Sequence, residues 1–169
     1  MRALVLVLAL VLAGCPKGGG ESSGSSSAPL VNALVQVPDE AALPDGLTTK
    51  ATGKGVALLA GEASASALAN AGCTVIVELG SDAAVAKVAG LGALMSIVQA
   101  DPRPAAEFSG TLKLAEGAPS SPASPGLTLA PPAGDVATVR GPLSGLPALL
   151  AQDWVVALEL AQAVRKKSK

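Results

Sequence analysis

Short apolar runs that recur at nearly constant spacing constrain the fold of this chain more than any other feature. They cover residues 56–60, 74–79 and 93–99, and a fourth run over 111–114 follows at about the next interval. Segments rich in Ala separate the first three runs. Short, continuous apolar strands that alternate with short helices are typical of βα units around a parallel sheet. The spacing therefore predicts a small α/β domain with a mostly parallel sheet.

The segments between the runs carry helix signals. Residues 64–71 are followed by Gly72, the residue type that most readily adopts the backbone conformation found after a helix. Ser81 and Asp82 can cap a second helix over residues 83–89. The constant spacing leaves a short βα solenoid open as an alternative, although the units share no fixed Leu or Asn pattern.

The flanking segments complete this picture of the domain. Further strands are expected over residues 30–37, 127–130 and 136–140. Residues 117–126 consist mostly of Pro, Ser, Gly and Ala and predict a long loop. Apolar residues at helical spacing predict a C-terminal helix over about 147–166, with Trp154 on its buried side. Basic residues 165–167 would complement the dipole at its end.

The N-terminal residues resemble a sorting signal. One Arg and an apolar run rich in Leu, Val and Ala precede Leu12–Cys15, whose sequence is Leu-Ala-Gly-Cys. A charged start, a short apolar core and small residues predict a secretory signal peptide over residues 1–14. The run is too short to span a bilayer. Its end resembles the lipobox of bacterial lipoproteins, which implies cleavage after Gly14 and diacylglycerol on Cys15.

The resemblance also implies a location and a domain organisation. The residue after Cys15 is Pro16, whereas Asp at that position retains Gram-negative lipoproteins in the inner membrane. We therefore expect an anchor in the outer membrane, facing the periplasm. The lipidated Cys and the Gly- and Ser-rich residues that follow form a predicted flexible linker over 15–29, with a reach of roughly 20 Å. A single domain is expected over 30–169.

The composition excludes several classes of function. His and Tyr are absent, and one Phe and one Trp are the only aromatic residues among 169. The chain carries 12 basic and 13 acidic residues, so it lacks the positive excess that a nucleic-acid backbone requires. Stacking platforms for bases are nearly excluded as well. We expect no nucleic-acid partner, and a core built from Ala, Val and Leu.

Catalytic motifs are also missing from the sequence. Without His there is no Ser-His-Asp set and no His-containing zinc site. Residues 53–55, Gly-Lys-Gly, lack the spacing of a phosphate-binding loop. If Cys15 carries lipid, Cys73 has no disulfide partner and is expected to pack as a small apolar side chain. We predict no catalytic residue and no cofactor.

One group of carboxylates could still form a site. Glu62, Asp82 and Asp101 each follow a predicted strand, at intervals of 20 and 19 residues. In a parallel sheet they would share the edge at which ligands bind, and together they could hold Ca²⁺ or Mg²⁺. Each also has a local role, because Asp82 can cap a helix and Asp101 begins an Asp-Pro turn. We favour the local roles over a metal site.

Two classes of function therefore remain. The first is a lipid-anchored envelope protein that acts as a non-catalytic interaction or structural module and contacts another protein or the cell wall. The second is a small ligand- or metal-binding domain, or an enzyme, that uses the carboxylates at the strand ends. We favour the first class because the usual catalytic groups are missing from the sequence.

Overall fold

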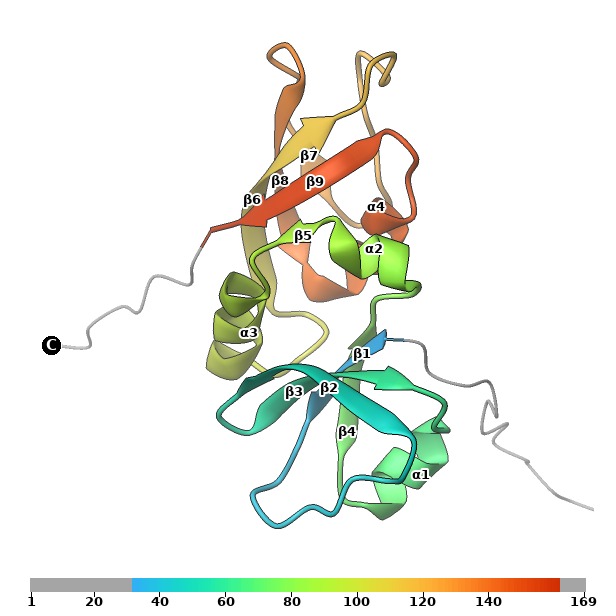
Figure 1. Cartoon of the computed structure of the whole chain (residues 1–169). Coiled ribbons are helices and arrows are strands. Elements are labelled where there is room, and N and C mark those ends of the chain that lie inside the picture. Colours follow the sequence, from blue (N-terminus) through green and yellow to red (C-terminus); the bar gives the residue numbers. More distant parts are fainter. Residues whose placement is uncertain (1–31, 162–169) are drawn as a thin grey trace, which may run out of the picture.

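The computed structural model describes residues 32–161, which form two β-sheets arranged one after the other along the long axis of the molecule (Figure 1). The predicted signal peptide over 1–14 and the linker over 15–29 lie outside the described residues. Four short helices accompany the sheets: α1 (Ala65–Asn70), α2 (Asp82–Ala86), α3 (Leu91–Ala100) and α4 (Leu146–Leu150). No helix within residues 32–161 has the length and hydropathy needed to cross a membrane.

The first sheet is fully antiparallel, with its strands in the order β2-β3-β1-β4. Its strands are β1 (Asn32–Gln36), β2 (Leu47–Gly53), β3 (Val56–Gly61) and β4 (Thr74–Glu78). Residues 54–55 join β2 to β3 in a tight hairpin, and Gly55 there adopts a φ of 71°, as such hairpin turns require. One face of the sheet packs against Leu68 of α1 and against Cys73.

The second sheet has the strand order β5-β9-β6-β8-β7, and only the β5–β9 pair is parallel. Its strands are β5 (Val88–Ala89), β6 (Glu107–Leu114), β7 (Thr128–Leu129), β8 (Val136–Pro142) and β9 (Val155–Leu160). A single turn of 3₁₀-helix, Leu143–Gly145, leads into α4. Leu146, Leu149 and Leu150 of α4 are buried in the same cluster as the inner face of this sheet.

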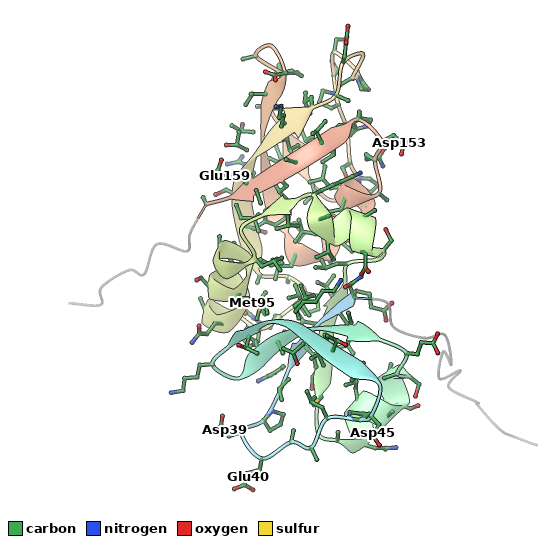
Figure 2. All side chains as sticks on the ribbon, viewed as in Figure 1. Asp39, Glu40, Asp45, Met95, Asp153 and Glu159 are labelled. Atoms are coloured by element: carbon green, nitrogen blue, oxygen red, sulfur yellow. The ribbon has the colours of Figure 1, made fainter. Side chains whose placement is uncertain are left out.

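One buried cluster connects the two sheets. It contains Leu34 of the first sheet and Leu158 of the second, both with 0% of their surface exposed. Helix α3 belongs to the same cluster and contacts β2 and β3. Met95 lies on the side of α3 that faces the first sheet (Figure 2). Burial of these apolar side chains gives the two sheets a common source of stability.

The structure contradicts the prediction of a mostly parallel α/β sheet and also its solenoid alternative. Both sheets are antiparallel apart from the β5–β9 pair. The run 93–99, expected to be a strand, lies within α3, where Leu94, Met95, Ile97 and Val98 are buried. A continuous apolar run of this length fits a buried strand and a buried helix equally well, so the pattern alone could not separate them.

The prediction of a C-terminal helix over 147–166 is also wrong. Helix α4 ends at Leu150, and β9 begins at Val155 and pairs with β6. Trp154 is half-buried in the turn between these two elements rather than on a helix. Two β-branched residues open β9, and such residues favour strands over helices. Residues 162–166 lie outside the described part of the chain.

Several local predictions are confirmed. The strands expected near residues 30–37, 56–60, 74–79, 111–114, 127–130 and 136–140 contain or overlap β1, β3, β4, β6, β7 and β8. The helix expected over 64–71 is α1, and Ser64 caps its start, because the Ser64 Oγ accepts a hydrogen bond from the Ala67 amide. The second predicted helix ends early, because α2 stops at Ala86 and β5 follows it.

Candidate functional site

The three carboxylates singled out in the sequence occupy separate local environments. Asp82 begins α2, Asp101 follows α3 rather than a strand, and Glu62 follows β3. Within residues 32–161, no group of three or more His, Cys, Asp or Glu side chains is arranged to hold a metal ion. Strands β3 and β4, which precede Glu62 and Asp82, both end at the edge of the first sheet where β1 begins, but Asp101 follows a helix, so an edge shared by all three carboxylates does not form.

Two of these carboxylates are paired with basic side chains. Asp82 Oδ1 accepts hydrogen bonds from Lys50 Nζ at 2.5 Å and from Asn32 Nδ2 at 3.0 Å. These contacts join the start of α2 to β2 and β1 of the first sheet. Asp101 accepts two hydrogen bonds from Arg103, at 2.6 and 2.7 Å. In each case the hydrogen bond from the basic partner lowers the pKa of the carboxyl group.

The Asp82 contacts lead to a prediction about pH. A carboxyl group whose pKa is lower in the folded than in the unfolded state contributes stability above the unfolded pKa, and this contribution is lost as the pH falls through the folded pKa. We therefore expect Asp82→Asn to have a lower free energy of unfolding than wild type near neutral pH. The difference between the two free energies should shrink as the pH falls below about 4. Urea unfolding of both proteins at a series of pH values would measure this difference in the free energy of unfolding. A difference that stays constant down to pH 2 would contradict the assigned role of the Lys50 contact.

The larger candidate site is the solvent-exposed face of the second sheet. In β6 and β8 the side chains alternate between the core and solvent, as expected for strands covered on one face only. We call the outward side chains the polar face. They are Glu107, Ser109, Thr111, Lys113, Thr128, Val136, Thr138, Arg140, Pro142, Ala157 and Glu159.

The strand register arranges the polar face in cross-strand rows. Arg140 lies between Thr128 and Ser109 in one row. The next row is Thr138, Thr111 and Glu159, and the row after it is Val136, Lys113 and Ala157. Side chains directly opposite on neighbouring strands are about 5 Å apart, close enough to act together on one ligand. Hydroxyl and charged side chains are therefore interspersed on the polar face, with Thr111 and Thr138 side by side near its centre.

A shallow, open hollow of about 750 Å³ follows these rows across β7, β8, β6 and β9. Its polar lining side chains are Ser109, Thr111, Thr128, Thr138, Arg140 and Glu159. Glu159, labelled in Figure 2, lies at the outside of β9. Hydroxyl groups can both donate and accept hydrogen bonds, whereas Arg140 only donates and an ionised Glu159 only accepts. The polar groups of the hollow can therefore both donate and accept hydrogen bonds, and they lie beside apolar surface from residues such as Ala130 and Ala161.

The sequence analysis did not identify the polar face. Only 111–114 of β6 was expected to be a strand, although the alternation of exposed and apolar residues starts at Glu107. Gly110 interrupts that alternation, which weakens the signal of a half-buried strand. No protein-family model, curated protein or solved structure matches this chain. The interpretation of the polar face therefore depends on its own chemistry.

Proposed function

We propose that this chain is a lipid-anchored protein of the bacterial envelope that binds a protein partner through the polar face and catalyses no reaction. The anchor is diacylglycerol on Cys15, and the location is the outer membrane, facing the periplasm. The lipobox-like sequence supports the anchor. The observation that carries the binding role is the solvent-exposed, hydroxyl-lined face of the second sheet.

The chemistry of the polar face favours a protein over a uniformly charged polymer. Arg140 and Lys113 supply positive charge, and Glu107 and Glu159 supply negative charge on the same face. A uniformly charged polymer would be repelled by half of these groups, whereas a protein surface can match both signs. The side chains project from strands that are already paired in a sheet, so little conformational freedom of the backbone is lost when a partner binds.

The linker geometry is compatible with this role. Strand β1 starts at Asn32, soon after the predicted linker over 15–29. Residues 16–31 would span at most roughly 55 Å when fully extended, and a flexible chain of this length has a typical reach of about 20 Å. The domain could therefore turn its polar face toward neighbouring proteins while the lipid stays in the bilayer.

A cysteine substitution tests the anchor directly. We expect wild-type protein to sediment with membranes and Cys15→Ala to lose the acyl mass, because a thioether to the lipid needs the Cys15 thiol. Mass spectrometry of the N-terminal peptide and fractionation of envelopes would measure both effects. Two or more acyl chains give stable attachment, so we expect nearly all of the wild-type protein in the membrane fraction.

Cys73→Ala is the matched control, because Cys73 is buried, with 4% of its surface exposed, where it packs with Leu68 against the first sheet. This variant should keep the acyl mass and the membrane fraction of the wild type. An unmodified amino terminus on wild-type protein, or a leader that is never cut, would contradict the proposed anchor.

A further inference from the structure

We propose that the partner of the polar face is a second copy of this chain. The proposal rests on the binding role assigned to this face and specifies its occupant. The two copies pack sheet against sheet around a two-fold axis. The axis lies in the plane of the interface and crosses the strands at the level of Gly110.

The outward residues of β6 make this strand self-complementary. Glu107 lies at one end, Lys113 lies at the other, and Ser109 and Thr111 lie between them, all on the solvent side. At about 3.4 Å per residue, the two charges are roughly 20 Å apart. A half-turn about an axis at Gly110 reverses the direction of the strand. It therefore places Glu107 of each copy opposite Lys113 of the other, and Ser109 opposite Thr111.

The outward residues of β8 agree with the same rotation. Val139 pairs with Gly110 and so lies at the level of the axis. The half-turn places Val136 opposite Pro142 of the other copy and Arg140 opposite Thr138. Val136 is 39% exposed and is one of two large apolar side chains that are exposed within residues 32–161. The pairing would bring this side chain into contact with an apolar partner, while Arg140 gains a hydroxyl acceptor.

Two other ways of pairing copies through the second sheet are disfavoured. A two-fold axis along β6 would stack Glu107 on Glu107 and Lys113 on Lys113, and like charges across an interface suppress association. Pairing through the edges of the second sheet would use β5 or β7, which have only two residues each. Such short edges offer little backbone to a further strand. The charge pattern thus selects one arrangement of two sheets, which would lie about 10 Å apart.

Charge reversal in two differently tagged chains tests this arrangement. Full-length chains would be expressed together, extracted in mild detergent and purified through one tag, and the second tag would then be quantified. When both chains carry Glu107→Lys, or both carry Lys113→Glu, two repulsive pairs replace two attractive ones. We expect co-purification of either matched pair to fall by about tenfold or more relative to wild type.

The decisive sample mixes the two variants. A Glu107→Lys chain opposite a Lys113→Glu chain restores two oppositely charged pairs, so we expect co-purification to return to the wild-type level. The chain with both substitutions should pair with itself equally well. Lys54→Glu, a reversal at an exposed site in the β2–β3 turn, should leave pairing unchanged. Circular dichroism of each variant would show that the fold is retained.

The outcomes separate this proposal from the proposed function. Wild-type chains that do not co-purify would overturn the two-fold pairing, as would matched variants that co-purify as well as wild type. A mixed pair that stays as weak as the matched pairs would overturn it too. The acyl mass and the membrane fraction depend on Cys15 alone, so the lipid anchor can hold while the pairing fails.

Discussion

Leu34→Ala should lower the free energy of unfolding by about 2–5 kcal/mol, because it removes a fully buried side chain from a packed core. Leu34 lies on β1 with 0% of its surface exposed. It belongs to the same buried cluster as Leu158 of the second sheet. We therefore expect the substitution to lower the stability of both sheets. Trp154, the only Trp of the chain, contacts that cluster next to β9 and reports on the second sheet.

Chemical unfolding followed by two signals would check this result. Far-UV circular dichroism reports on both sheets, and Trp154 fluorescence reports on the second sheet alone. Both transitions should move together to lower denaturant concentration in Leu34→Ala. Val156→Ala is the control, since Val156 is 48% exposed and its truncation should change stability by no more than about 0.5 kcal/mol. A Trp154 transition that stays unshifted in Leu34→Ala would contradict a core shared by the two sheets.

The sequence predicted where most strands lie but not how they pair. The runs at β3 and β4 are short, apolar and bounded by turn residues, which is a local signal. The direction of pairing depends on contacts between distant segments. β1, for example, lies between β3 and β4 and runs antiparallel to both. A spacing of 18 to 19 residues fits βα units whose strands are neighbours, but β3 and β4, although they run in the same direction, are separated by β1.

The candidate site was harder to predict for the same reason. The middle row of the polar face joins Thr111 to Thr138 and to Glu159, so it needs the register of three strands that are distant in sequence. The nearly equal intervals between Glu62, Asp82 and Asp101 suggested a shared site that is absent, because the segment before Asp101 is the helix α3 and not a strand. The helix cap at Ser81 is confirmed, since its Oγ accepts from the Ala84 amide at 3.2 Å and depends on only a few neighbouring residues.

Gly61→Ala should lower the free energy of unfolding by about 3–5 kcal/mol, as much as Leu34→Ala or more. Gly61 ends β3 with a φ of 132°, a backbone conformation that residues with a side chain rarely adopt. A Cβ atom at this position would lie 2.3 Å from the carbonyl oxygen of Gly46. That atom belongs to the backbone next to β2, so it cannot move without disturbing the pairing of β2 with β3. Thermal and urea unfolding would measure the loss.

Gly80→Ala separates the two causes of this effect. Gly80 also has a positive φ, of 87°, but a Cβ atom there would meet no heavy atom within 4 Å. Its substitution carries only the backbone cost, about 1–2 kcal/mol. Gly61→Ala adds the steric overlap with Gly46 to that cost, so it should be clearly the more destabilising of the two. Equal losses of stability in both variants would show that the backbone at Gly46 can shift to make room for the new side chain. The close approach of the chain at Gly46 to Gly61 would then contribute little to the stability of the first sheet.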